Sequence, residues 1–459
     1  MYDTLIIGAG MSGLAAGIRL AHFGKRVCVL ERHTTVGGLN SFYRLGGRNY
    51  DVGLHALTNY VPRGTKRGPL ALIFRQLRLG WDDWQLAPQL GSTIVFPGVR
   101  LDFTNDFDQF RSEILRYFPD QKEGLDRLVA GLAGYDELGQ PDTRRSARQA
   151  VAECIREPLL VEMIFCPIQF YGSARQHDLD FGQFSVLFRS IFLEGLARPL
   201  AGIRRILRTL ARKFKASGGE LRLRAAVRQI AVDRGRAAGV VLEDGTELPA
   251  RTVLSSAGFR ETMLLCDPAT GPLPPIGDIS FVESICTLDA LPRTLGLDRA
   301  VLFFNDSPRF SYARPDDLVD VRSGVVCVPN NFDYDEPMPD GWVRLTALAN
   351  YDRWVRLDPE DYGRAKLDSY ERMAASATRF VPDFRPSVAA VDTFTPTTIR
   401  RYTGHLGGAV YGCPEKCYDG STHVKNLYLC GTDQGYVGII GVILSGISIA
   451  NRYLLKDEG

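Results

Sequence analysis

The chain opens with apolar runs separated by glycine. Residues 2–7 are mostly apolar and lead into three glycines, residues 14–24 are rich in small and apolar side chains, and residues 27–31 form a second apolar run that ends in an acid. Short apolar runs bounded by glycine are typical of strands, and the longer stretch between them is typical of a helix. We therefore predict a strand, a tight turn, a helix and a second strand at the N-terminus.

The C-terminal part repeats this order. Residues 426–430 are an apolar run, residues 431–441 are rich in glycine and contain Asp433, and residues 443–453 carry small and apolar side chains. This pattern again predicts a strand, a glycine turn and a helix.

The middle of the chain predicts one helical block and two sheets. Residues 106–172 place apolar side chains at helical spacing, and Pro199 is predicted to open a strongly amphipathic helix. Residues 220–258 are short alternating runs punctuated by glycine, which predict a small sheet that returns to the first strands. Residues 276–395 suggest a second sheet, and residues 358–379 within this range predict one more helix.

Composition narrows the class of protein. The chain has 459 residues, 45% of them apolar, and a net charge of +2. This length predicts two joined domains, and the small charge argues against nucleic acid as a partner. The N-terminus lacks the pattern of a signal peptide and no apolar run has the length of a bilayer span, so we expect the mature chain to start near Met1 and to lie in the cytoplasm.

The cysteines predict a reducing compartment and no metal centre. Nine are present, an odd count, and most stand singly in apolar surroundings. Cys413 and Cys417 form the one close pair, and His405 and His423 are the nearest further ligands, but this spacing matches no familiar zinc pattern.

The N-terminal glycines predict a dinucleotide site. Gly8 allows the tight turn, Gly10 lets the backbone approach a pyrophosphate, and Gly13 lets the helix pack close to the strand. The pyrophosphate is then expected at the helix N-terminus, where Met11 and Ser12 stand. Glu31 ends the second strand, where its carboxylate can accept both hydroxyls of an adenosine ribose and repels a 2′-phosphate, so FAD or NAD is expected.

A second glycine pair favours FAD over NAD. Gly37 and Gly38 follow the ribose acid closely and suit a loop that runs along an extended FAD without side-chain collisions. At the other end of the chain, a helix starting between Gly438 and Val442 is placed to direct N–H groups at the pyrimidine edge of a flavin, and Asp433 at its ribityl hydroxyls.

Several of these segments resemble one family. The sequence is similar to the phytoene desaturase, carotenoid isomerase and retinol saturase group of FAD-dependent oxidoreductases. The matching segments are Gly8–Gly13, Glu31–Thr34 with Gly37–Gly38, Tyr50–His55, Gly218–Gly258, Thr395–Gly404 with Tyr411–Gly412, and Asn426–Gly446. Leu39 and Asn40 after the double glycine are closer to the isomerase and saturase branch, and Gly435–Gly438 lacks the proline of many desaturases.

The resemblance implies an α/β fold in which a Rossmann-like FAD-binding domain is assembled from three chain segments around an inserted α+β substrate domain. The expected FAD-binding segments are 1–105, 199–275 and 396–459, with a helical substrate-side and membrane-side domain over 106–198 and a substrate-domain sheet over 276–395. It also implies that a larger set of residues contacts FAD, namely Gly8, Gly10, Met11, Ser12, Gly13, Glu31, Arg32, Gly37, Gly38, Leu39, Asn40, Val227, Ala257, Gly431, Asp433, Gly438, Ile439 and Ile440.

The implied substrate is a lipophilic isoprenoid polyene, a carotenoid or its precursor, that is desaturated, saturated or isomerised. His55 and Tyr411 are the candidates for groups near the reacting bond, although each also suits a loop residue that satisfies a backbone hydrogen bond. Peripheral membrane contact is hypothesised through residues 70–79 and 181–196, which suit buried helices equally well. The electron partner stays open among oxygen, a quinone and a diffusible reductant. The alternatives are a flavin amine oxidase acting on a soluble amine and a non-catalytic prenyl-lipid escort protein.

Overall fold

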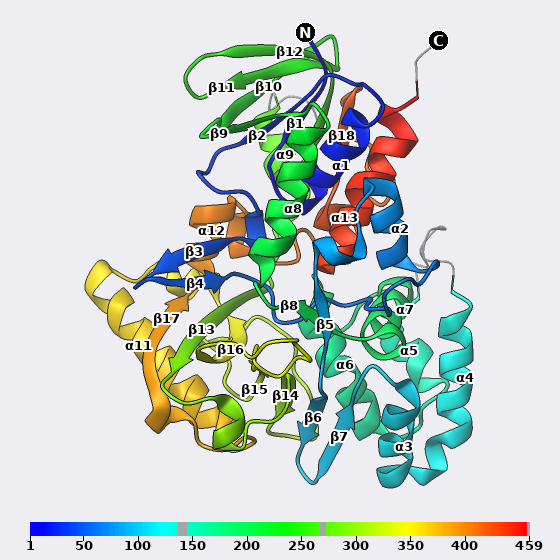
Figure 1. The fold of residues 1–459 in the computed structure, drawn as a ribbon, viewed down its shortest axis with the longest axis vertical. Helices are drawn as coiled ribbons and strands as arrows, with labels where there is room; N and C mark the ends of the chain where they lie inside the picture. The colour runs from blue at the N-terminus through cyan, green and yellow to red at the C-terminus, as the bar shows by residue number, and fades with distance from the viewer. Residues whose placement is uncertain (136–144, 267–271, 457–459) are drawn as a thin grey trace.

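Two sheets organise the chain. The computed structural model describes residues 1–135, 145–266 and 272–456 (Figure 1). The first sheet has the order β10-β11-β12-β1-β2-β9, with β18 added beside β12, and the second has the order β17-β13-β16-β15-β14-β6-β7. The mixed α/β architecture agrees with the predicted Rossmann-like domain and its inserted substrate domain.

The first sheet has a parallel centre. β1 pairs in parallel with both β2 and β12, and β12 pairs in parallel with β18. All five residues of β2 are buried, as expected of a parallel strand covered on both faces. The strands are β1 (Tyr2–Ile7), β2 (Val27–Glu31), β9 (Glu220–Leu223), β10 (Val227–Asp233), β11 (Arg236–Leu242), β12 (Glu247–Ser255) and β18 (Leu427–Leu429).

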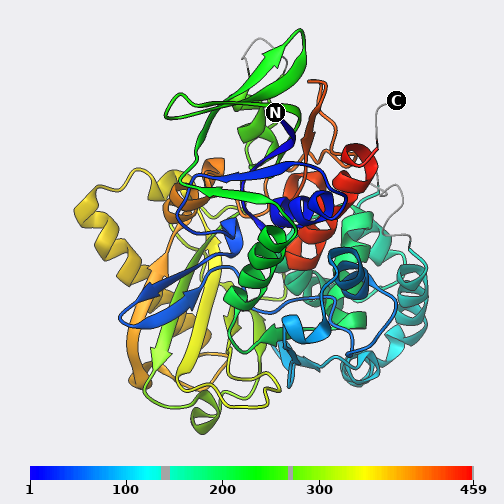
Figure 2. The ribbon, with the colours of Figure 1, turned by 45° about the horizontal axis from the view of Figure 1, so that its top comes forward.

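Glycines bring the two ends of the chain together beside this sheet. Helices α1 (Met11–Ala21) and α13 (Gly438–Ile449) lie side by side in both views (Figures 1 and 2). A Cβ atom at Gly446 of α13 would lie 2.1 Å from the carbonyl oxygen of Ser12 in α1. Only glycine therefore permits this approach, and segments more than 400 residues apart share one layer.

The second sheet is antiparallel except where β14 pairs in parallel with β6. Its strands are β6 (Ser92–Phe96), β7 (Val99–Phe103), β13 (Ser280–Leu288), β14 (Val301–Asn305), β15 (Ser323–Cys327), β16 (Gly341–Ala349) and β17 (Val388–Phe394). The prediction that all of residues 1–105 join the FAD-binding part does not hold for β6 and β7, because their pairing partners lie in this sheet.

The helical block lies to the lower right in Figure 1 and agrees with the prediction for residues 106–172. Its helices are α3 (Phe107–Tyr117), α4 (Lys122–Ala133), α5 (Ala147–Ala152), α6 (Pro158–Gly172) and α7 (Phe181–Phe188), the last continued by a π-helical turn (Arg189–Glu194). The remaining helices are α2 (Pro69–Leu77), α8 (Ile203–Ala216), α9 (Phe259–Leu265), α10 (Tyr351–Trp354), α11 (Pro359–Ala377) and α12 (Pro396–Thr403).

The amphipathic helix α8 starts later than predicted. Pro199 lies in the short strand β8 (Ala197–Pro199), which pairs with β5 (Leu86–Pro88). Gly202 separates this strand from the helix, and its φ of +65° breaks the helical path. A second pair of strands, β3 (Phe42–Leu45) and β4 (Arg48–Asp51), forms a hairpin beside the second sheet.

The two segments predicted to contact a membrane bury most of their apolar side chains within the protein. In α2, Leu70 and Ile73 are 0% exposed, and in the second segment Phe184 and Phe188 are also 0% exposed. Their apolar faces pack against other parts of the chain, so the membrane hypothesis was wrong in its choice of segments. In the parts of the chain that the structure describes, none of the helices combines the length and apolarity needed to cross a bilayer.

Candidate active site

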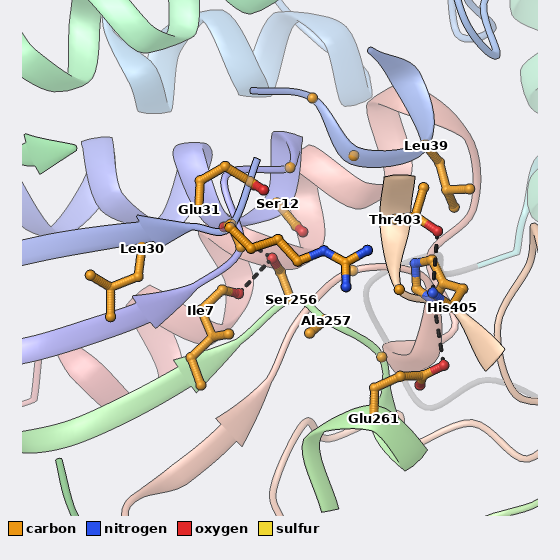
Figure 3. Close-up of a pocket in the computed structure, with 18 of the residues that line it drawn as sticks. Ile7, Ser12, Leu30, Glu31, Leu39, Ser256, Ala257, Glu261, Thr403 and His405 are labelled. Atoms are coloured by element: carbon orange, nitrogen blue, oxygen red, sulfur yellow. Dashed lines mark hydrogen bonds and ion pairs between the residues drawn. The ribbon is translucent and has the colours of Figure 1, made fainter. Parts of the chain in front are cut away.

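A turn between β1 and α1 forms one wall of a pocket at the carboxyl edge of the first sheet. Gly8 has a φ of +95°, and Ser256 donates to the carbonyl oxygens of Ile7 at 2.9 Å and Gly8 at 3.1 Å, which fixes the turn (Figure 3). A Cβ at Gly13 would lie 2.2 Å from the Gly8 carbonyl oxygen, whereas a Cβ at Gly10 would meet nothing within 4 Å. Gly8 therefore serves the turn and Gly13 the helix packing, while Gly10 leaves open space at the start of α1.

The N-terminus of α1 has neither a side-chain cap nor a negatively charged residue beside it. Gly10 provides no side-chain cap, and no acidic residue stands in the first turn. Met11 and Ser12 line the pocket at this end of the helix. It is the positive end of the helix dipole, and its first backbone N–H groups have no acceptor within the helix. This end of the helix suits an anionic ligand group.

Glu31 supplies the opposite charge at the end of β2. Its carboxylate accepts hydrogen bonds from the backbone N–H groups of Ala9 and His33, both at 2.9 Å, and the residue is 8% exposed. These bonds hold the carboxylate in place at the pocket wall (Figure 3). The remaining lone pairs are oriented before any ligand arrives.

Most residues predicted to bind the cofactor line this pocket, which has a volume of about 260 Å³. They are Gly8, Gly10, Met11, Ser12, Glu31, Arg32, Gly37, Gly38, Leu39, Asn40, Val227, Ala257, Gly431 and Asp433. Gly438 and Ile439 line a second, adjoining cavity, and Gly13 packs α1 against the turn. Ile440 stands next to Ile439, and its side chain is 1% exposed and belongs to the apolar core, so that a contact with the cofactor would come from its backbone.

Asp433 reaches the pocket, but its carboxylate is used by the protein. Its two oxygens accept from the backbone N–H groups of Phe259 at 2.6 Å and Cys413 at 2.7 Å, and Lys416 Nζ lies 3.5 Å away. Asp433 thus ties three chain segments together at the pocket wall. The preceding residue, Thr432, lines both cavities and was missed by the sequence analysis.

The second cavity has a volume of about 810 Å³ and lies between the two sheets. Aromatic and aliphatic side chains cover much of its wall, among them Phe170, Tyr171, Phe281, Phe303, Val325, Val410 and Ile439. It shares Glu31, Gly38, Leu39, Asn40, Tyr402, Thr403, Thr432 and Val442 with the first pocket. A cofactor in the first pocket can therefore reach a molecule held in the second.

Both predicted catalytic residues line the second cavity. His55 Nε2 lies 2.8 Å from Thr346 Oγ1, and burial, together with the positive charges of Arg344 and Arg198, lowers the pKa of His55 well below its ordinary value. The imidazole is therefore neutral at pH 7. Tyr411 donates its hydroxyl to the carbonyl oxygen of Phe170, and burial raises its pKa, so the phenol stays protonated.

A buried charge network behind the cavity escaped the sequence analysis. Arg198 Nη2 lies 2.6 Å from Asp51 Oδ2, and Arg344 Nε donates to Glu283 Oε1 at 2.5 Å. Both arginines also donate to the carbonyl oxygen of Leu54. The sequence did contain one signal for this network, which is an ionisable residue within a mostly apolar strand. Arg344 is that residue in β16, and Glu283 is that residue in β13.

The first pocket fits the cofactor that the sequence predicts. Gly10 leaves the space a pyrophosphate needs, the uncapped start of α1 supplies unpaired donors, and Glu31 supplies an oriented acceptor for ribose hydroxyls. The backbone of Gly37 and Gly38 extends the wall of this pocket toward the second cavity.

Comparison with known proteins gives the same picture. The family described as flavin containing amine oxidoreductase matches residues 11–454. Prolycopene isomerase 2 of an Oncidium hybrid cultivar is 24% identical over 503 residues, which cover 98% of this chain and 83% of that protein. All-trans-retinol 13,14-reductase of Danio rerio is 24% identical over 535 residues, which cover 98% of this chain and 86% of that protein.

A solved structure shares the fold. An oxidoreductase from Methanosarcina mazei has a TM-score of 0.69 and 18% sequence identity, with 98% of this chain and 100% of that chain covered.

Proposed function

We propose, since this chain belongs to the family of flavin-containing amine oxidoreductases, that it is an FAD-dependent oxidoreductase acting on a lipophilic isoprenoid polyene. The reaction is a desaturation, a saturation or a cis–trans isomerisation. The curated relatives reported above act, by their names, on prolycopene and on all-trans-retinol, which are both polyenes.

The observation that carries this proposal is the junction of the two cavities. The second cavity is about three times the volume of the first and is walled largely by aromatic and aliphatic side chains. A long apolar chain gains free energy from such a wall at roughly 25 cal/mol for each Å² of apolar surface removed from water. A small soluble amine would fill little of this space.

FAD would be held by the N-terminal glycine turn, the start of α1, Glu31, and the backbone around Val227, Ala257 and Gly431. When bound, it supplies the redox chemistry by taking up or returning a hydride. Gly438 and Ile439, at the start of α13, line the second cavity, and Val442 of the same helix lines both cavities, so this end of α13 suits the flavin end. The chain's own part is to orient the polyene and to exclude water.

His55 and Tyr411 are the proposed groups at the reacting bond. Neutral His55 presents a ring nitrogen that can accept or donate a proton through Thr346. Tyr411 fixes the part of the aromatic wall formed by Phe170 through its hydrogen bond to that residue. Replacing His55 with alanine is expected to leave FAD bound and to reduce turnover by about 10²-fold or more, in the range of positioned acid–base groups.

The test begins with the purified protein. A yellow protein whose FAD is reduced or reoxidised by a conjugated isoprenoid, and not by putrescine or benzylamine, supports the proposal. Reduction by the amines alone would assign a flavin amine oxidase instead. A colourless protein that binds polyene without taking up FAD would assign a lipid escort.

We also propose that the rim of the second cavity contacts an anionic membrane from the cytoplasmic side. Leu45, at the end of the β3–β4 hairpin, and Tyr402 are 51% and 49% exposed, and both line the cavity. Arg44 and Arg48 stand on the same hairpin and are exposed. This combination of apolar and basic side chains suits the surface of a bilayer.

The nine cysteines are unpaired, which supports a reducing compartment.

Flotation with phosphatidylglycerol vesicles tests this surface. The Leu45→Asp variant is expected to stay in the soluble fraction, while the wild type floats. Leu223→Asp is the matched control, because Leu223 is 41% exposed on β9 of the other sheet. Equal flotation of both variants would place the contact elsewhere.

A further inference from the structure

One row of side chains crosses the second sheet and forms a wall of the larger cavity. Successive strands β17, β13, β16, β15 and β14 bring five residues into direct register, which all line the cavity: Phe394, Glu283, Thr346, Val325 and Phe303. Residues paired across adjacent strands point to the same face of a sheet. The cavity wall therefore follows one line across the sheet.

The centre of this row is polar, and both of its ends are apolar. Glu283 and Thr346 are neighbours in the row and are only 3% and 6% exposed. His55 joins them from the loop after β4, with Nε2 at 2.8 Å from Thr346 Oγ1 and 3.8 Å from Glu283 Oε1. Three hydrogen-bonding side chains thus meet in the middle of a row whose ends, Phe394, Val325 and Phe303, are apolar.

The negative charge of this cluster is already balanced. Arg344, two residues before Thr346 on β16, forms an ion pair with Glu283 and donates to the carbonyl oxygen of Leu54. Among the described residues, the ion pairs and hydrogen bonds of the Glu283 carboxylate use Oε1. This arrangement leaves Oε2 to accept a hydrogen bond from a molecule in the cavity.

We propose that Glu283, Thr346 and His55 form a binding site for an alcohol hydroxyl on the substrate. The substrate class is then an isoprenoid alcohol instead of an unsubstituted hydrocarbon. This inference rests on the proposed function and narrows it.

The chemistry of the three side chains selects a hydroxyl among the common oxygen groups. The Glu283 carboxylate needs a donor, which a ketone or an ether lacks and a hydroxyl has. A carboxylate on the ligand would be repelled by Glu283. A hydrocarbon would strip water from three polar side chains without replacing it, and sites built to bind a hydroxyl strongly reject analogues that lack one.

The experiment compares three probes of equal chain length on the FAD-loaded protein: geranylgeraniol, the matched hydrocarbon and the matched primary amine. Binding is followed by the change in the flavin absorbance spectrum. The wild type is expected to bind the alcohol at least about tenfold more tightly than the hydrocarbon, and Thr346→Val to remove most of this preference. Thr346→Ser restores the hydroxyl and is expected to keep the preference.

The matched control is Thr393→Val. The Thr393 hydroxyl on β17 lies 2.7 Å from that of Ser284 on β13, so this variant loses a buried threonine hydroxyl that has a protein partner. It is expected to keep the preference for the alcohol.

Each other outcome overturns the inference in a distinguishable way. Equal binding of alcohol and hydrocarbon overturns the hydroxyl site and leaves the polyene proposal standing. Preference for the amine assigns Glu283 to an ammonium group, and loss of FAD from Thr346→Val assigns the cluster to the cofactor. Binding of none of the probes overturns the isoprenoid proposal together with this one.

Discussion

Gly446 of α13 and Ser12 of α1 are in backbone contact, because the position of a Cβ at Gly446 lies only 2.1 Å from the Ser12 carbonyl oxygen. Ser12 also lines the nucleotide pocket. The last helix of the chain thus sets the position of the first helix, whose N-terminus faces the pocket. Folding of the C-terminal segment and formation of the nucleotide pocket are consequently coupled.

Gly446→Ala is expected to destabilise the protein and to weaken FAD retention together. The added methyl group must push α13 away from α1, and overpacking of this kind costs typically about 1–3 kcal/mol. Urea unfolding and the FAD released on gel filtration measure the two effects. Gly441→Ala is the control on the same helix, because its Cβ would have its closest contact at 3.4 Å. An equal loss in both variants would show that helix packing at Gly446 is not special.

Two glycines of the N-terminal turn are expected to respond differently to the same substitution. Gly10 has a φ of −68° and free space around its Cβ position, so Gly10→Ala should change the unfolding free energy of the FAD-free protein by less than about 0.5 kcal/mol. The methyl group then occupies the proposed pyrophosphate cradle and should weaken FAD binding at least about tenfold.

Gly13→Ala should affect the stability of the FAD-free protein, which Gly10→Ala should leave nearly unchanged. Its Cβ would lie 2.2 Å from the Gly8 carbonyl oxygen, so the FAD-free protein itself should lose about 1–3 kcal/mol of unfolding free energy. Unfolding of the FAD-free forms and FAD titration separate the two effects. If Gly10→Ala binds FAD as tightly as the wild type, the cradle is elsewhere.

The sequence predicted the nucleotide pocket well because its signals are local. The spacing of Gly8, Gly10 and Gly13 and the acid at Glu31 each depend on a few adjacent residues. Val227, at the start of β10, which the resemblance implied to contact FAD, also lines this pocket.

The sequence could not predict features that depend on distant pairing. β6 alternates in the same way whichever sheet it joins, and its partner β14 lies about 200 residues further on. The ion pair of Glu283 with Arg344 likewise needs the register of β13 on β16. An apolar helix such as α7 has the same pattern whether protein or lipid covers it, which is why the sequence could not show that this segment is buried in the protein.

The buried ion pair of Arg198 with Asp51 is expected to matter far more than an exposed pair of similar geometry. The two side chains are 4% and 8% exposed at an N···O distance of 2.6 Å. Arg198→Met leaves a buried carboxylate without its partner and should cost about 3–5 kcal/mol of unfolding free energy. Arg63→Met is the control, because Arg63 pairs with Asp82 at 2.7 Å with both side chains more than 70% exposed, and should cost less than about 1 kcal/mol.

A double variant checks the cause of this loss. Arg198→Met with Asp51→Asn removes both charges and should be less destabilised than Arg198→Met alone. Urea midpoints of the wild type and the two variants measure this order. A double variant that is less stable than Arg198→Met would mean that Asp51 stabilises the protein through contacts other than this ion pair.

The pH dependence of stability should carry a contribution from His22, at the end of α1. Burial, together with the charges of Arg78, Lys213 and Arg19, lowers the pKa of His22 to about 4 from an ordinary value of 6.5. As the pH falls below 6.5, His22 is therefore protonated in the unfolded chain but not in the folded protein. The unfolding free energy decreases as a result until the pH reaches about 4. Below that pH both states are protonated, and the slope from this group disappears.

The variant His22→Gln isolates this contribution, because all other titrating groups are common to both proteins. The wild type should lose about 1 kcal/mol relative to the variant between pH 7.5 and pH 4, a figure reduced for the partial exposure of the ring. Salt at 1 M should shrink the difference without abolishing it, since burial is its largest cause and ions screen only the three cations. A difference that stays constant across this pH range would mean that the His22 ring protonates as freely in the folded protein as in the unfolded chain.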